Sequence, residues 1–331
     1  MTPDGQATGL SMARKGRAKP MTTITLTGDN GYTPYHGQNF AAGTIIDASA
    51  ASWIVANSRG DPETEGCNTG SASINRYPFK VTNAPSVQIN DGTINGEVPQ
   101  DTTWENTYKD LNTGGSCNSA AMRLENCANA VVEGWRIDQC WDGIRFADGC
   151  QGWTVRRVWA SDARDDFIEN DLLLSGTIND CLFDGCLVGL SIARSSSNQG
   201  LDGSGNEITI NGLLLRMANR SFNGSMTHAS PFKTDPTEAV LPSLRITNSV
   251  IAISNVNHES KSRLQRAWNR TVESSGNYYL NLSDDAMPGD YPKSFAALGG
   301  GDWGGFTVLQ GQVARDFWDA KRAAWLCSIG H

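Results

Sequence analysis

The 331-residue sequence has few charged residues, no long apolar run and no closely spaced pair of cysteines. Charged residues make up 19% of the chain and give a net charge of −8, so the basic stripe of a nucleic-acid binder is missing. No window approaches the roughly 18 consecutive apolar residues of a membrane-spanning helix. None of the eight cysteines forms a Cys-x-x-Cys pair, which argues against a structural zinc site and a disulfide scaffold. We therefore expect neither nucleic acid nor a membrane as a partner.

The N-terminal segment carries basic side chains but lacks the apolar stretch of a recognisable secretion signal. We interpret residues 1–20 as a disordered leader. The folded part is predicted to begin at residue 21, because residues 22–26 alternate like a strand. The sequence leaves the cellular compartment and the oligomeric state open.

A repeat runs through the middle of the chain, with a period of about 23 residues. Blocks that begin at Val132, Val155 and Ile178 place apolar residues in the same columns. Further columns hold Trp135, Val158 and Cys181, then Ile137, Ala160 and Phe183, then Ile144, Phe167 and Leu190. The chain is also rich in glycine, and frequent turns with short alternating strands are typical of β architecture.

With insertions allowed, rungs begin near residues 89, 132, 155, 178, 210 and 246. The insertions form three excursions, over residues 95–120, 194–207 and 217–243. A period of this length suits one coil of a parallel β-helix, whereas a leucine-rich repeat would need a Leu-x-x-Leu-x-Leu skeleton that is absent. We predict an all-β fold, a right-handed parallel β-helix over residues 21–256, since parallel crossovers favour that hand.

The rung pattern stops after residue 256, and residues 257–331 are predicted to form a C-terminal extension of the same domain. Apolar residues recur at helical spacing over residues 313–326. We expect a helix there that caps an open end of the stack, as protection against edge pairing.

One pair of cysteines fits the repeat. Cys127 and Cys150 are separated by one full period, so we expect them to stack on adjacent coils. Their oxidation state is not predicted.

The densest group of ionisable residues lies at residues 162–171 and on the coil before it. We select Asp142, Asp165, Asp166 and Glu169 as candidate catalytic residues, because crowded carboxylates can divide into one acid and one base. In the alignment of the repeats Glu169 falls in a column with Phe146 and Ile192. It should therefore lie on a bulge or be buried against an arginine or backbone donors. An Asp-rich solvated turn and a calcium site are the alternatives.

Further residues around this group could bind a sugar through cationic, aromatic or imidazole side chains. The candidates for substrate binding are Arg145, Arg164, Arg194, Trp141, Trp104, His228 and Lys233.

The rung pattern over residues 80–256 resembles the pectate-lyase-like superfamily of right-handed parallel β-helices. Within it, residues 141–144 (Trp-Asp-Gly-Ile), 165–168 (Asp-Asp-Phe-Ile) and 189–192 (Gly-Leu-Ser-Ile) resemble successive motifs of polygalacturonase-type glycoside hydrolases. That resemblance implies catalytic roles for Asp142, Asp165 and Asp166, and a secreted or periplasmic location. The sequence departs from the motifs where Cys140 and Trp141 replace Asn-Thr, where Val188 replaces His, and in lacking Arg-x-Lys.

The sequence is compatible with three functions. The first is a cofactor-free polysaccharide hydrolase that uses paired carboxylates, on a glycan that could contain uronate. The second is a polysaccharide lyase in which acidic residues hold Ca²⁺ and Lys233 or an arginine abstracts a proton. The third is a non-catalytic, glycan-binding or adhesive β-helix.

Overall fold

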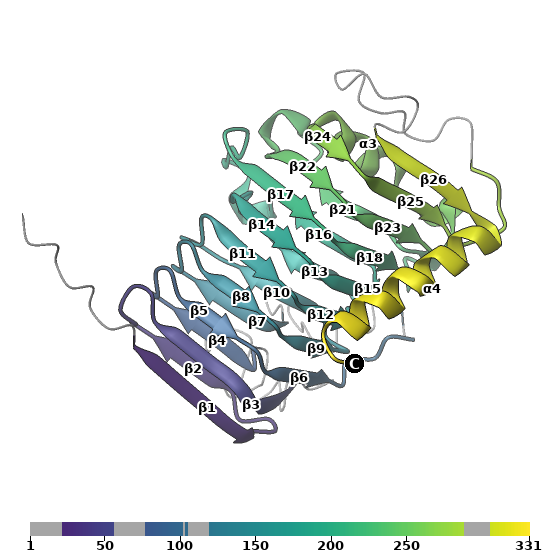
Figure 1. The fold of residues 1–331 in the computed structure, drawn as a ribbon. Coiled ribbons are helices and arrows are strands. Elements are labelled where there is room, and N and C mark those ends of the chain that lie inside the picture. The colour runs from purple at the N-terminus through teal and green to yellow at the C-terminus, as the bar shows by residue number, and fades with distance from the viewer. Residues whose placement is uncertain (1–21, 56–76, 102, 105–118, 288–304) are drawn as a thin grey trace, which may run out of the picture.

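The structure is a computed structural model that describes residues 22–55, 77–101, 103–104, 119–287 and 305–331. Its strands stack in parallel, coil upon coil, and confirm the predicted parallel β-helix (Figure 1). The expected leader at residues 1–20 lies outside these residues. No helix in the described ranges is long and apolar enough to cross a lipid bilayer.

Each coil contributes to three faces. The first face contains β1 (Thr23–Asp29), β3 (Ile45–Val55), β5 (Gln88–Asn90), β8 (Val131–Glu133), β11 (Trp153–Arg156), β14 (Gly176–Asn179), β17 (Glu207–Asn211), β22 (Ser243–Thr247) and β24 (Thr271–Ser275). The second face contains the later halves of β1 and β3, then β6 (Thr93–Gly96), β9 (Arg136–Asp138), β12 (Trp159–Ser161), β15 (Leu182–Cys186), β18 (Leu214–Met217), β23 (Val250–Ile253), β25 (Asn277–Asn281) and β26 (Phe306–Gln310).

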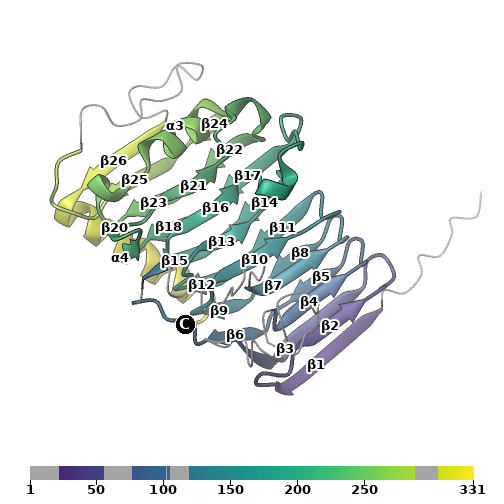
Figure 2. The same ribbon diagram turned by 180° about the vertical axis from the view of Figure 1, so that it is seen from behind.

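The third face is a separate sheet (Figure 2). It contains β2 (Tyr35–Gln38), β4 (Phe79–Thr82), β7 (Ala120–Glu125), β10 (Asp142–Phe146), β13 (Asp166–Glu169), β16 (Val188–Ile192) and β21 (Ser230–Thr234). Outside the three faces lie a hairpin of β19 (Arg220–Phe222) and β20 (Ser225–Thr227), the helices α3 (Lys261–Asn269) and α4 (Gly311–Ser328), and the 3₁₀ turns Ser196–Asn198, Glu238–Val240 and Val256–His258.

The predicted columns form the interior of the first two faces. Val155 pairs with Val132 on one side and Ile178 on the other, and all three side chains are buried. The same column continues to Ile89 and to Ile210, as the longer spacings predicted. Because successive strand residues point to opposite sides, one apolar residue per coil at this register fills the core.

Backbone conformation explains the bend between the first and second faces. A residue with positive φ occupies this corner in coil after coil, at Asp91, Gly134, Arg157, Asp180, Gly212, Asn248 and Gly276. Glycine, asparagine and aspartate adopt this left-handed conformation at low cost, which explains their frequency at the corner.

The stack continues beyond residue 256, where the sequence repeat ends. β24 pairs with β22, and β25 pairs with β23 and then with β26. In the β24 coil Ser274 occupies the column held by Ile246. The predicted boundary was therefore too early, because the added coil lacks the apolar residue that marks the others.

The predicted C-terminal helix is present as α4, but it does not cap an end of the stack. It lies along the outside of the second face and runs back from β26 toward β12 (Figure 1). Trp318 and Trp325 pack there on outward-facing residues that include Leu214 and Val250. These outward residues form an apolar column, so burying it under α4 stabilises the fold.

The stacked cysteine pair is confirmed. Cys127 and Cys150 are buried thiols, and backbone hydrogen bonds on either side join their two coils. The hydrogen bond that Cys150 donates to Cys127, together with burial, raises the pKa of the Cys150 thiol well above its usual value.

Candidate functional site

One additional residue in the turn before β13 changes the predicted register of the third face. Ile144 pairs with Ile168, and Ile168 pairs with Leu190. The spacing from Ile144 to Ile168 is therefore one residue longer than the period, and the spacing from Ile168 to Leu190 is one residue shorter. The predicted match of Ile144 with Phe167 was therefore wrong, and so was the match of Glu169 with Phe146. Glu169 instead pairs with Arg145.

The shift places Glu169 in an outward-facing polar column that crosses the third face. Its members, in order along the stack, are His36, Lys80, Arg123, Arg145, Glu169, Ser191 and Lys233. The Glu169 carboxylate lies 3.0 Å from a guanidinium nitrogen of Arg145. This agrees with the predicted burial of Glu169 against an arginine.

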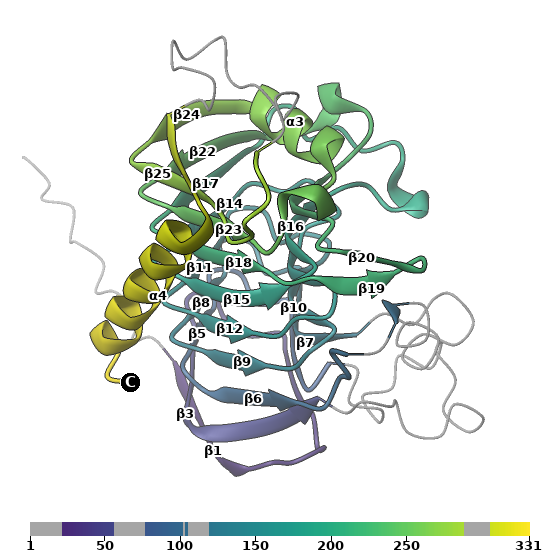
Figure 3. The ribbon, with the colours of Figure 1, turned by 90° about the vertical axis from the view of Figure 1, so that its right-hand side faces the viewer.

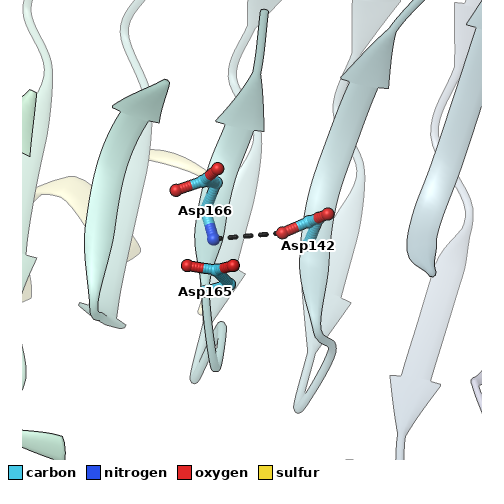
Figure 4. A group of neighbouring side chains, drawn as sticks. All are labelled: Asp142, Asp165 and Asp166. Carbon is cyan, nitrogen blue, oxygen red and sulfur yellow. Dashed lines mark hydrogen bonds between the residues drawn. The ribbon is translucent and has the colours of Figure 1, made fainter. Parts of the chain in front are cut away.

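Three carboxylates gather beside this column, on β10 and at the start of β13 (Figure 4). Each of Asp142, Asp165 and Asp166 offers an oxygen, and these oxygens lie within 4.8 Å of one another. The backbone N–H of Asp166 donates to Oδ1 of Asp142 at 3.2 Å. Asp142 and Asp166 are each only 1% exposed, whereas Asp165 is partly exposed.

Burial and mutual repulsion favour the protonated forms of the two hidden aspartates. Burial raises the pKa of Asp142 well above its usual value, and the nearby Glu169 and Asp166 add to the shift. Burial also raises the pKa of Asp166, and the opposing charge of Lys233 does not cancel the effect. Glu169 follows the same pattern, with its pKa raised by burial against the opposing charge of Arg145.

Lys233 brings the compensating charge from β21. Its Nζ lies 3.1 Å from Oδ2 of Asp166. Burial lowers the pKa of Lys233, but the carboxylates of Asp166 and Asp165 outweigh burial and hold it well above its usual value. Lys233 is therefore a fixed ammonium at the centre of the site.

Two cavities flank the cluster. The larger, of about 490 Å³, has apolar walls with charged and hydroxyl groups between them, and is lined by Trp104, Asp165, Leu187, Val188, Phe222, Thr227, Ala229, Lys233, Ser260 and Arg263. The smaller, of about 210 Å³, is polar and is lined mainly by Arg123, Arg145, Asp148, Glu169, Asp171 and Ser195. Asp165 and Glu169 therefore each reach a cavity, while Asp142 and Asp166 lie behind them.

The structure brings most of the predicted binding residues to this face. Lys233 and Trp104 line the larger cavity, and Arg145 lines the smaller one. Trp141 is buried and supports Trp104, with ring centroids 5.5 Å apart.

Three other predicted binding residues have structural partners instead. Arg164 is buried and donates to the carbonyl of Ser221 in the hairpin, at 2.8 Å. Arg194 forms an ion pair with Asp235, at 2.9 Å.

His228 is also buried, and its Nε2 lies 2.8 Å from the carbonyl oxygen of Asn255. Burial lowers the pKa of this imidazole to about 4, so it is neutral near pH 7. These contacts place Arg164, Arg194 and His228 in the protein framework, and we do not assign them to substrate binding.

Phe222 and Arg263 also line the larger cavity, and neither was predicted from the sequence. Phe222 belongs to the hairpin β19–β20, which stands out from the side of the molecule that carries the third face (Figure 3). Arg263 belongs to α3, beyond the residues where the repeat was visible. Neither lies in a repeat column, so the period carried no signal for them.

Comparisons with known proteins add one structural likeness. No family model matches the sequence, and a search of curated proteins finds no match. Among solved structures, the chain is similar to a pectin methylesterase from Yersinia enterocolitica, with 13% identity and a TM-score of 0.38, over 72% of this chain and 78% of that one. Similarity at this level carries no inference about function, so the resemblance to polygalacturonase-type hydrolases stays a prediction.

Proposed function

We propose that the protein is a carbohydrate-active enzyme that hydrolyses glycosidic bonds of a polysaccharide at the third face. The observation that carries this proposal is the group of Asp142, Asp165 and Asp166, whose oxygens lie within 4.8 Å of one another beside a cavity with an aromatic wall. Crowding buried carboxylates costs stability, and such perturbed groups cluster at functional sites.

The arrangement supplies the two groups that hydrolysis needs. Asp166, kept protonated by burial, supplies the acid proton, which reaches the leaving oxygen through Asp165 because Asp166 lies behind Asp165. Asp165 lines the larger cavity and serves as the second carboxylate.

The acidic group fits Ca²⁺ poorly. Calcium takes about six to eight oxygen ligands, and Asp166 already has the Lys233 ammonium at 3.1 Å. A raised pKa also makes Lys233 a poor base for the proton abstraction of a lyase. These two points favour hydrolysis over elimination.

A product-resolved screen against neutral and acidic polysaccharides tests the proposal. We expect new reducing ends and activity that survives a chelator. Unsaturated products with strong ultraviolet absorbance would contradict hydrolysis and show that the protein is a lyase. Binding without cleavage of any polysaccharide in the panel would contradict both enzymatic functions and favour a non-catalytic, glycan-binding protein.

A further inference from the structure

Most cations near the carboxylate group already contact partners within the protein. Arg145 contacts Glu169, Lys233 contacts Asp166, and the predicted ligands Arg164 and Arg194 are held by Ser221 and Asp235. Each of these contacts consumes the charge or the hydrogen bonds that a ligand would need. A cation available to a ligand must therefore come from elsewhere.

Arg263 meets that requirement. Arg263 lines the larger cavity and is partly exposed, and its guanidinium group has no hydrogen-bond or ion-pair partner among the residues that the structure describes. A guanidinium that lines a cavity without a partner can offer its planar set of donors to a carboxylate or sulfate group.

The helix α3 fixes the position of Arg263. Leu264, Ala267 and Trp268 are buried and hold the helix against β21, and Thr234 Oγ1 on β21 donates to the Arg263 carbonyl at 3.1 Å. The strand β21 also carries Lys233. The unpaired guanidinium and the acidic group therefore belong to one rigid part of the molecule.

Aromatic rings form another wall of the same cavity. Trp104 and Phe222 lie edge to face, with centroids 5.1 Å apart. The hairpin that carries Phe222 is anchored by Arg220, which donates to the carbonyls of Gln100 and Gly185 at 3.0 Å. Flat apolar surfaces of this kind can pack against the apolar face of a sugar ring.

We infer that the larger cavity is a binding subsite for an anionic sugar unit. The ring packs against Trp104 and Phe222, the negatively charged substituent binds Arg263, and the adjoining linkage faces Asp165. This inference rests on the proposed function, because it takes the ligand to be a glycan. A carboxylate and a sulfate ester share the required chemistry.

The test measures binding and turnover of Arg263→Gln with three oligosaccharides: one containing uronic acid, its carboxyl-reduced neutral counterpart, and a sulfated galactan. We expect the wild type to prefer an anionic probe. The substitution should weaken binding of that probe about tenfold or more, raise KM more than it lowers kcat, and leave the neutral probe unaffected. The two anionic probes distinguish carboxylate from sulfate.

Arg266→Gln is the matched control. It removes the same charge from the same helix, but Nε of Arg266 donates to Thr234 Oγ1, at 3.1 Å, and the side chain does not line the cavity. Its preference for the anionic probe should equal that of the wild type, and a melting curve for each variant checks folding. Equal losses in both variants, or equal losses on charged and neutral probes, would overturn the inference.

The binding measurement also distinguishes a failure of this inference from a failure of the proposed function. Binding of an anionic probe that depends on Arg263, without cleavage, would support the subsite and contradict hydrolysis. Cleavage that proceeds equally well in Arg263→Gln would support hydrolysis and contradict the subsite.

Discussion

The outer surfaces of the second and third faces are built on the same coils and differ in almost every property. The second face presents an apolar column that includes Leu182, Leu214 and Val250, and α4 covers it; Asp184 beside this column pairs with Arg322 of the helix. The third face presents arginine, lysine and carboxylate side chains beside two cavities. Only alternate residues of each strand fill the core, so the outward residues of one coil can be apolar on one face and charged on another.

This contrast separates stability from chemistry. The covered face gains stability through burial of apolar area, whereas the polar face bears the cost of buried carboxylates. Substitutions on the second face should therefore change stability and spare activity, whereas substitutions on the third face should change activity and largely spare stability.

The largest effect is expected from Asp166→Asn. Loss of the acid should reduce turnover about 10³-fold, with only a small change in melting temperature because the side-chain shape is retained. Steady-state kinetics and a thermal melt on the same preparation measure both quantities. Asp142→Asn and Glu169→Gln extend the test, and full activity in all three variants would contradict the assignment of the third face.

The reverse signature is expected from Trp318→Ala on α4. Trp318 is buried against the second face, so its truncation should lower the free energy of unfolding by about 3 to 5 kcal/mol. Activity per folded molecule should stay at the wild-type level. Denaturant unfolding gives the stability, and Val313→Ala, at a position 63% exposed on the same helix, is the matched control with little expected change.

A smaller, pH-dependent effect is expected at Glu259, a buried carboxyl outside the acidic group. Burial raises its pKa from 4.5 to about 8; as the pH rises between these values the unfolded chain ionises while the folded state keeps its proton, so stability falls. Glu259→Gln should raise stability by about 1 to 3 kcal/mol at pH 8 and confer no gain at pH 4. Unfolding curves at several pH values would show this trend, and a gain that is independent of pH would refute it.

The smallest effect is expected in the interior, which belongs to neither outer face. Cys127→Ala should cost about 1 kcal/mol, since a small buried side chain is replaced by one slightly smaller. In the native protein an alkylating reagent should modify Cys327, which is exposed, before Cys127 or Cys150. Mass spectrometry after brief alkylation measures the order, and early modification of the buried pair would contradict the stacked arrangement.

The sequence predicted the interior of the fold better than its functional surface. Val132, Val155 and Ile178 were placed correctly because the core accepts only apolar side chains at that position in every coil. The same reasoning failed at Phe167 and Ile168, where two consecutive apolar residues hide a shift of one residue.

The candidate site was predicted only in part. The carboxylates were visible as a dense group in the repeat, but the cavity beside them depends on the hairpin and on α3, which interrupt the period. Arg164 and Arg194 were predicted to bind a ligand, yet their partners Ser221 and Asp235 follow them after 57 and 41 residues, offsets that the insertions set and the period does not. Pairing of this kind cannot be read from a repeat.

The path of α4 has a mechanical consequence. In a stacked fold each coil contacts only its neighbours, so such a molecule can open one coil at a time. The helix links distant coils, because it starts after β26, Trp325 donates to Asp180, and His331 packs on Trp159 of β12. While α4 stays docked, the coils from β12 to β26 cannot separate one at a time. The C-terminal half should therefore yield in a single step, whereas the coils before β12 are free to unravel gradually.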